Sequence, residues 1–569
     1  MHGENHQTPA APSIGDYAII GDCRTAALVS GAGSIDWLCL PNFSSTSVFA
    51  KLLDSRGGSF SLHPTAAFTS TRTYVSGTAV LETMFETESG SARVFDCLPV
   101  LDGIKQLRPL REILRIVEGQ TGTISFRASI DPRPNYARLE PKPKRAGRLG
   151  WSFSWHNEVL HVQTDIDLVP EASILQGTFS VTAGQRRYLS LSYCLSEPAV
   201  IPPLRPEADE RLNNTVAWWK GWSAQLEYEG PYKHAVVRSA VTLKLLSSST
   251  SGAIIAAPTT SLPETIGGER NWDYRYCWLR DAGLTMQAMI GLGVKEDAGA
   301  FLHWLLHATR LTWPKLKIMY DIYGRTNLHE RELAHLAGYR ESRPVRIGNG
   351  AHRQQQTDVY GELILAAYSY AAAGGVIDRA GARMLAGLGE VVHGIWREPD
   401  SGIWEMRGAP RQFTFSKVMC WTAFDRLIAL DEIGAVRLGD KAATFKADRT
   451  AIAQVIEARG FNNAIKAYTG ELDGDTVDAS LLLMSSVGYK KASDPRIKST
   501  YALICERLGQ RGLLQRYEPG VDGLKGDEGA FGICSFWALE QLAQRGEVAL
   551  AEKQFAHLLV IRQRCGALC

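Results

Sequence analysis

The densest group of residues that could bind a polar ligand lies between positions 271 and 281. These eleven residues include two Trp, two Tyr, two Arg and two Asp. Arg280 and Asp281 place a fork of hydrogen-bond donors beside a pair of acceptors, and Trp278 adds a flat apolar wall. The alternative is an Arg–Asp ion pair that only caps a helix, but a cap does not need so many aromatic rings. The pattern therefore favours a site for a ligand rich in hydroxyl groups, such as a hexose.

Two further segments each carry a carboxyl group that could transfer a proton. Glu405 follows Trp404 in a short turn bracketed by glycines. Burial beside an indole raises the pKa of a carboxyl group and keeps it protonated near neutral pH, as a general acid requires. Glu528 lies in a glycine-flanked loop before an apolar helix, where it could hold a water molecule and deprotonate it. Alternatively, the acidic residues at 527–528 only complement the dipole of that helix.

Other polar clusters are compatible with the wall of a pocket. Gln356 and Asp358 belong to a polar segment at the start of an apolar helix. His329 and His335 flank two Glu, but their spacing of six differs from the i, i+4 pair of a helical zinc site. No segment matches a nucleophile elbow, a phosphate-binding loop or a dinucleotide-binding loop. We therefore expect a site without a metal ion or an organic cofactor.

The elements that must position these residues change character along the chain. From residue 14 to about 200, short segments of alternating apolar and polar residues are separated by Gly and Pro turns, which is the pattern of an antiparallel β-sandwich. Beyond a Pro-rich charged stretch at 202–209, apolar residues recur at helical spacing. Helices are predicted at 210–226, 234–246, 271–291, 295–309, 358–373, 380–396, 417–430, 441–459, 476–485, 495–510, 530–545 and 553–564.

Helices in this number, with the polar motifs in the loops between them, favour an (α/α)-type toroid with its site at one end. A solenoid of repeats is the alternative, but the chain has no self-similarity of fixed period. We predict four regions, which are a disordered N-terminus at 1–13, a β-sandwich domain at 14–205, a helical linker at 206–232 and a helical catalytic domain at 233–569.

The composition limits the class of partner. Lys and Arg total 62 against 60 for Asp and Glu, so the formal net charge of +2 gives no electrostatic reason to expect nucleic acid or an anionic membrane. The first 13 residues lack the apolar segment of a secretory signal, and the most apolar stretch, 363–377, is too short to span a bilayer. Ten Cys without a CxxC pair are typical of buried thiols. We expect a cytoplasmic enzyme that acts on a small neutral molecule.

Taken in order, the three clusters at 271–281, 400–408 and 523–537 resemble glycoside hydrolase family 15, which contains glucoamylases and certain bacterial and archaeal trehalases. The segments 14–30 and 34–39 look like the N-terminal domain of the trehalase-like branch. The resemblance runs over nearly the whole chain. It implies an N-terminal antiparallel β-sandwich followed by an (α/α)6 toroid, the architecture of six-hairpin glycosidases.

The same resemblance implies roles for individual residues. Arg280 and Asp281 match the pair that grips the non-reducing glucose. Glu405 matches the general acid and Glu528 the general base, with Glu518 as the rival for the base. The residues expected to bind the substrate are Trp278, Arg280, Asp281, Trp404, Gln356 and Asp358.

An inverting, exo-acting hydrolysis that releases glucose is also implied by the resemblance. In that mechanism the two carboxyl groups stand roughly 6.5–9.5 Å apart, and neither a metal nor an organic cofactor is needed. The trehalase-like N-terminal segments and the lack of a secretory signal favour α,α-trehalose as the substrate. The alternatives are an α-glucan glucohydrolase of the glucoamylase or isomaltose type, an inverting disaccharide phosphorylase, and a sugar-binding protein without activity.

Overall fold

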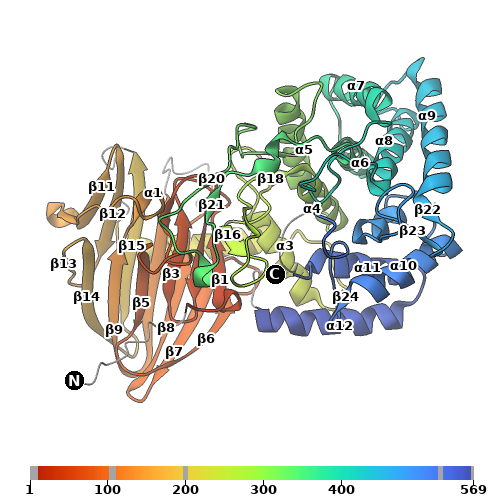
Figure 1. The fold of residues 1–569 in the computed structure, drawn as a ribbon. Coiled ribbons are helices and arrows are strands. Elements are labelled where there is room, and N and C mark those ends of the chain that lie inside the picture. The colour runs from red at the N-terminus through yellow and green to blue at the C-terminus, as the bar shows by residue number, and fades with distance from the viewer. Residues whose placement is uncertain (1–10, 101–110, 196–202, 523–528, 566–569) are drawn as a thin grey trace.

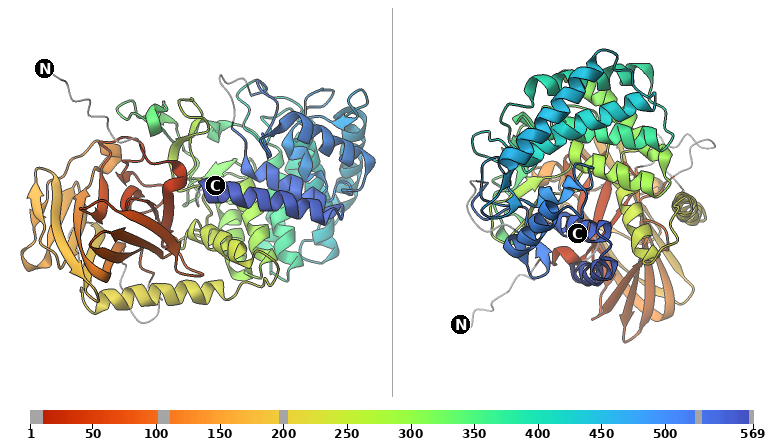
Figure 2. Two further views of the ribbon diagram at one scale, coloured as in Figure 1. Left: turned by 90° about the horizontal axis from the view of Figure 1, so that it is seen from below. Right: turned by 90° about the vertical axis from the view of Figure 1, so that its right-hand side faces the viewer.

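The computed structural model describes residues 11–100, 111–195, 203–522 and 529–565 (Figure 1). Strands make up the N-terminal part and helices most of the C-terminal part, and the two parts lie side by side. Helix α2 (Glu207–Ser223) runs from the β domain to the helical domain along one side of the molecule (Figure 2).

The N-terminal part is an antiparallel sheet of fifteen strands folded into two layers. The long strand β9 (Glu112–Asp131) belongs to both layers. Its first half pairs with β8 (Gly90–Cys97) and β15 (Arg186–Leu195), and its second half pairs with β5 (Ser59–Pro64) and β14 (Ile174–Thr182). The prediction of an antiparallel β-sandwich is confirmed. The other strands are β1 (Tyr17–Gly21), β2 (Ala26–Ser30), β3 (Ser34–Cys39), β4 (Ser47–Phe49), β6 (Thr69–Tyr74), β7 (Leu81–Thr87), β10 (Lys144–Arg145), β11 (Trp151–Trp155), β12 (Glu158–Thr164) and β13 (Val169–Glu171).

The core of the β domain lies between its two layers. Along β5, buried and half-buried side chains alternate with a period of two, because successive residues of a strand point to opposite faces. The inward-facing apolar side chains of both layers form one cluster, which includes Ile20, Phe60, Phe85, Val94, Phe126 and Leu191.

Helix α2 contributes to the cores of both parts. Near its start, Ala208 and Leu212 pack in a small apolar cluster with strands of the β domain. Near its end, Trp219 and Trp222 belong to the core of the helical domain. The linker predicted at 206–232 thus contains α2 and ends where α3 (Lys233–Leu245) begins, while its bounds as a domain division stay a prediction.

The helical domain consists of inner segments, which contact one another in chain order, and outer helices that follow them. The inner helices are buried around much of their circumference, as the continuous burial of α6 from Asp358 to Ala367 illustrates. This alternation agrees with the predicted (α/α) toroid (Figure 2). The inner segments are α4 (Leu279–Gly291), α6 (Asp358–Ala372), α8 (Thr414–Glu432), the 3₁₀ helix η6 (Ala479–Met484) and α11 (Gly532–Gln544). The outer helices are α5 (Lys295–Arg310), α7 (Arg379–Ile395), α9 (Lys441–Val455), α10 (Pro495–Leu508) and α12 (Val548–Cys565).

No helix in the described part of the chain has both the length and the apolar character that crossing a membrane requires.

The helix predicted at 271–291 begins only at Leu279. Two short strands precede it, β17 (Asn271–Asp273) and β18 (Cys277–Trp278). In β17 the first and last side chains are fully buried, whereas Trp272 between them is partly exposed. A period of two is typical of a strand, so the prediction of a helix before residue 279 is wrong. The pairing partners are β16 (Thr260–Pro263) and β19 (Met319–Tyr320).

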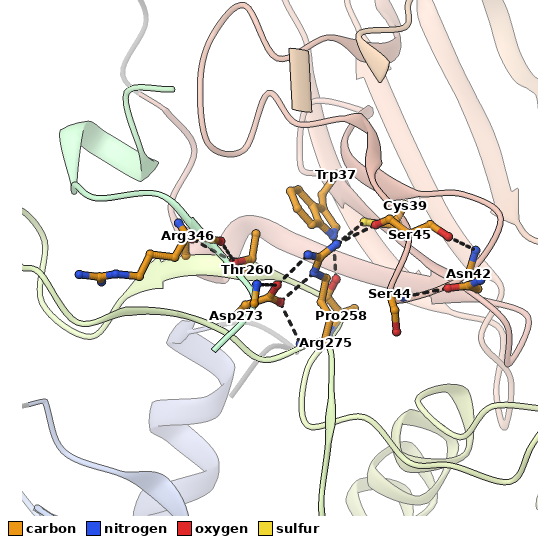
Figure 3. Close-up of polar contacts among 12 residues, drawn as sticks. Trp37, Cys39, Asn42, Ser44, Ser45, Pro258, Thr260, Asp273, Arg275 and Arg346 are labelled. Atoms are coloured by element: carbon orange, nitrogen blue, oxygen red, sulfur yellow. Dashed lines mark hydrogen bonds and ion pairs between the residues drawn. The ribbon is translucent and has the colours of Figure 1, made fainter. Parts of the chain in front are cut away.

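A buried ion pair joins the segment before α4 to the β domain (Figure 3). The guanidinium of Arg275 donates to both carboxylate oxygens of Asp273, at 2.8 and 2.7 Å. Its third nitrogen donates to the carbonyl oxygen of Ser45 at 2.8 Å. The indole of Trp37 donates to the carbonyl oxygen of Pro258, also at 2.8 Å. We call these five residues the domain joint, because they connect the two domains through hydrogen bonds within the interior.

Candidate active site

Glu405 lies in the turn between α7 and α8, and its carboxyl group contacts the segment that begins α4. The indole nitrogen of Trp278 donates to Oε1 of Glu405 at 2.7 Å. The Nη1 atom of Arg280 lies 3.9 Å from the same oxygen. The structure therefore brings together two motifs that are 127 positions apart in the sequence.

Burial raises the pKa of the Glu405 carboxyl group above its usual value. The positive charge of Arg280 and the hydrogen bond from Trp278 oppose this shift, because both favour the ionised form. The net direction is upward, so Glu405 holds its proton to a higher pH than an exposed glutamic acid. A carboxyl group in this state can act as a proton donor.

The backbone of Glu405 is in the left-handed region, with φ at 59°. Non-glycine residues adopt this conformation at a cost, and it persists where the surroundings hold it in place. The side-chain amide of Gln354 donates to the carbonyl oxygen of Glu405 at 3.2 Å. At the start of the turn, the carboxylate of Asp400 accepts hydrogen bonds of 2.8 Å from both the backbone and the hydroxyl group of Thr357. The turn is thus tied at two points to the segment 354–357, which leads into α6.

Trp404 is 8% exposed and is fixed from both ends. Its indole nitrogen lies 2.9 Å from each carboxylate oxygen of Asp478. Its ring packs against Trp537, with centroids 5.9 Å apart, and the guanidinium of Arg280 lies 5.8 Å from its centroid. Trp404 therefore links the turn that carries Glu405 to α4, η6 and α11.

Arg280 and Asp281 form an ion pair in the first turn of α4. The Nε atom of Arg280 donates to Oδ1 of Asp281 at 2.7 Å, and Nη1 donates to the carbonyl oxygen of Ile403. The side chain of Asp281 remains 33% exposed. Arg280 is therefore oriented by the turn before Glu405, while Asp281 keeps part of its carboxylate open to a ligand.

Gln356 and Asp358 are buried, with 4% and 0% of their surface exposed. The Nε2 atom of Gln356 and both carboxylate oxygens of Asp358 have no hydrogen-bond partner within the described residues. Burial raises the pKa of Asp358 to about 7, the charge of Asp400 adds to this shift, and Arg280 opposes it. One turn later in α6, burial and the charge of Asp358 raise the pKa of Glu362 to about 8.

One of the cavities of the described chain contains Glu405 in its wall. Neither Trp278 nor the Arg280–Asp281 pair lines this cavity, so these residues approach the carboxyl group of Glu405 from outside it. The lining residues are Arg270, Trp272, Tyr274, Asn349, Ala351, Trp404, Glu405, Arg407, Arg516, Tyr517 and Asp522.

Most of these lining residues were not predicted as site residues from the sequence. Arg270, Trp272 and Tyr274 carried a signal, because their i, i+2 spacing is that of one face of a strand. The prediction of a helix over 271–291 does not use this spacing. Arg407 and Asp522 carried no such signal, since their place in the wall depends on contacts with distant segments.

Glu528, the predicted general base, lies outside the described residues. The rival Glu518 is described, and its Oε1 atom accepts from the backbone nitrogen of Val477 at 2.9 Å and from Arg507 at 3.0 Å. These contacts give Glu518 a structural role in joining its loop to α10. Asp522, which precedes 523–528, lines the cavity and bonds Arg270 at 2.6 Å.

Among the described residues, no group of three or more His, Cys, Asp or Glu is arranged to hold a metal ion.

Comparisons with known proteins connect this site to a family. The model of Glycosyl hydrolases family 15 matches residues 230–562, and the model Trehalase-like, N-terminal matches residues 6–146. A protein named trehalase from Mycolicibacterium smegmatis is 36% identical over 96% of this chain and 85% of its own length. A protein named trehalase from Thermoplasma volcanium is 33% identical over 93% of this chain and 84% of its own length.

One solved structure shares the architecture of nearly the whole chain. A bacterial glucoamylase complexed with acarbose superposes with a TM-score of 0.69 over 96% of this chain and 88% of its own. The sequence identity is 13%, so the likeness concerns the fold alone.

Proposed function

Because the chain belongs to glycosyl hydrolase family 15, we propose that it hydrolyses α,α-trehalose to two molecules of glucose with inversion at the carbon that is attacked. The match to the trehalase-like N-terminal model and the two relatives named trehalase support this substrate. Hydrolysis of maltose, isomaltose or starch is the alternative within the same family.

Glu405 is the general acid in the proposed mechanism. It transfers its proton to the oxygen that bridges the two glucose units as the bond from that oxygen to the attacked carbon breaks. A water molecule attacks the opposite face of that carbon and gives its proton to Glu528, the proposed general base. One product is β-glucose, and the other keeps its α configuration.

The observation that carries this proposal is the environment of the Glu405 carboxyl group. Its side chain is only 22% exposed, its pKa is raised above the usual value, and Trp278 and Arg280 contact Oε1. Arg280 and Asp281 supply donors and an acceptor next to it, and both groups suit the hydroxyls of the glucose that is attacked. Trp278, Trp404, Gln356 and Asp358 complete the proposed binding site around that sugar.

A four-substrate assay tests the choice of substrate. Purified protein is incubated with trehalose, maltose, isomaltose and soluble starch, and glucose is measured at early times. We expect the highest kcat/KM for trehalose. Faster release from isomaltose or starch would overturn the trehalase assignment and leave the two-carboxyl mechanism intact.

Two variants test the general base. We expect Glu528→Gln to lower kcat by about 10²–10⁴-fold, the usual range for an acid–base group. Glu518→Gln removes the ion pair with Arg507 and is expected to affect mainly stability. Full activity of Glu528→Gln together with an inactive Glu518→Gln would assign the base to Glu518 instead.

A further inference from the structure

Trp272 and Arg407 stand together in the wall of the cavity that contains Glu405. The guanidinium carbon of Arg407 lies 4.4 Å from the centroid of the Trp272 ring. The guanidinium carbon of Arg346 lies 4.6 Å from the same centroid. Two cationic groups therefore pack against one indole, an arrangement that restricts their rotamers and favours positive charge over the ring.

Arg346 and Arg407 differ in how many of their N–H groups donate hydrogen bonds within the protein. Arg346 donates to the carbonyl oxygens of Glu269 and Asn271, at 2.6 and 3.4 Å, and so is tied to the strand that carries Trp272. Glu330 lies 3.6 Å from each guanidinium. Arg407 makes no hydrogen bond within the described residues and is 36% exposed, so its planar set of donors remains available in a fixed place.

The position of Glu405 indicates where the two sugars of the substrate bind. A general acid contacts the bridging oxygen, so one sugar must lie on each side of its carboxyl group. Arg280 and Asp281 approach that group from outside the cavity and are proposed to hold the sugar that is attacked. The cavity with Trp272 and Arg407 is then the place for the leaving sugar.

We propose that Arg407 binds hydroxyl oxygens of the leaving glucose and so determines the preference for a substrate with a second sugar. Trp272 and Glu330 act as positioning residues that hold the guanidinium in the wall. This inference rests on the proposed function, since it concerns the leaving group of that reaction. Hydrogen bonds from a charged donor to a sugar hydroxyl account for selectivity of this kind.

A pair of substrates separates binding of the leaving sugar from the rest of the reaction. Trehalose has a glucose leaving group, whereas α-D-glucosyl fluoride has the same glucose to be attacked and a leaving group without hydroxyls. We expect Arg407→Gln to lower the ratio of kcat/KM for trehalose to kcat/KM for the fluoride by about 10- to 100-fold. Arg407→Lys keeps the charge but loses the planar fork of donors. Its ratio should therefore lie between that of the wild type and that of Arg407→Gln.

The matched control is Arg145→Gln, which removes a guanidinium that packs on Trp151 in the β domain, 5.1 Å from its centroid. Its ratio should equal that of the wild type. Thermal unfolding of each variant verifies the fold. The alkaline limb of the pH profile for trehalose should keep its wild-type midpoint in Arg407→Gln, because Arg407 acts on the sugar.

Three results would overturn the inference while leaving the proposed function intact. They are wild-type activity of Arg407→Gln on both substrates, an equal loss on both substrates (either of which leaves the ratio unchanged), and a displaced alkaline limb, which would mean that Arg407 acts through Glu405. If the wild type cleaved the fluoride but not trehalose, the proposed substrate would be wrong, and the inference would fail with it.

Discussion

The domain joint and the candidate active site both bury arginine beside carboxylates, but they satisfy these charges to different degrees. In the joint, Arg275 donates hydrogen bonds through all three nitrogens, and Asp273 also accepts from the backbone of Gly348. In the site, Arg280 lies beside the carboxyl groups of Asp281, Glu405 and Asp358, and both oxygens of Asp358 lack a hydrogen-bond partner within the described chain. Buried charge that is fully paired serves the architecture. Buried charge that is incompletely paired lowers stability and is retained where a ligand completes it.

Removing the carboxyl group of the acid should have the largest effect on activity. We expect Glu405→Gln to lower kcat/KM for trehalose by about 10²–10⁴-fold or more, with the thermal midpoint near that of the wild type. The loss on α-D-glucosyl fluoride should be smaller, because fluoride departs with less help from a proton.

Glu432→Gln, at the exposed end of α8, is the control for Glu405→Gln and should change neither kcat/KM for trehalose nor the thermal midpoint. Equal losses of Glu405→Gln on trehalose and the fluoride would contradict the role of Glu405 as an acid.

Breaking the domain joint should lower stability strongly and activity only slightly. Arg275→Met leaves the carboxylate of Asp273 buried without its cation, which typically costs about 3–5 kcal/mol in the free energy of unfolding. We expect a large fall in the midpoint of urea denaturation and a much smaller change in kcat/KM of the folded protein than Glu405→Gln produces.

Arg275→Lys serves as the second variant here, since it keeps a charge in the joint and should lose less stability. If the midpoint of Arg275→Met equalled that of the wild type, the joint would not stabilise the fold.

Trp404 has both a structural and a functional role, because it packs in the core and holds the turn that carries Glu405. Trp404→Phe removes the donor to Asp478, and a hydrogen bond of this kind contributes about 1–3 kcal/mol. We expect kcat to fall by about 10-fold, with a modest fall in the thermal midpoint.

Trp155→Phe deletes a comparable indole hydrogen bond, to Glu158 in the β domain, and should leave kcat unchanged. A wild-type kcat in Trp404→Phe would show that the turn is held without this bond.

The last effect is a pH-dependent change in stability at the buried carboxyl group of Glu362. The pKa of Glu362 is raised to about 8 in the folded protein, from an ordinary value near 4.5. Below pH 4.5 the group is protonated in both states. Between that pH and about 8 the unfolded state loses its proton first, so stability falls as pH rises, by at most about 1.4 kcal/mol for each pKa unit.

Glu362→Gln removes this dependence. We therefore expect its thermal midpoint, relative to that of the wild type, to be higher at pH 8.5 than at pH 4.5. The same difference in midpoint at both pH values would contradict a protonated Glu362 in the fold.

The sequence predicted the change from strands to helices along the chain. It also predicted that the motifs around 278–281 and 404–405 belong to one site, because the residue types of each motif indicate its chemistry locally. Alternation and helical spacing identify the elements, and the residue types around 278–281 and 404–405 indicate shared chemistry. The structure then places Trp278 and Glu405 in direct contact.

Other features were beyond a local interpretation. The sequence predicts a helix at 271–273 where the structure has a strand, because the pairing of this strand with β16 is set by tertiary contacts. The stacking of Arg407 on Trp272 joins segments 135 positions apart, and no spacing rule connects them. The complete burial of Asp358 follows from the place of α6 inside the ring of helices, which its own residues do not reveal.

The most direct test of the central claim is proton and ¹³C NMR of the first glucose formed from trehalose in ¹⁸O-labelled water, since proton signals identify the anomers and ¹⁸O shifts the ¹³C signal of the carbon that bears it. The account predicts equal amounts of α- and β-glucose before mutarotation, with the label carried at first by the β anomer. Formation of α-glucose alone would mean retention of configuration and would contradict attack by a water molecule opposite a protonated Glu405.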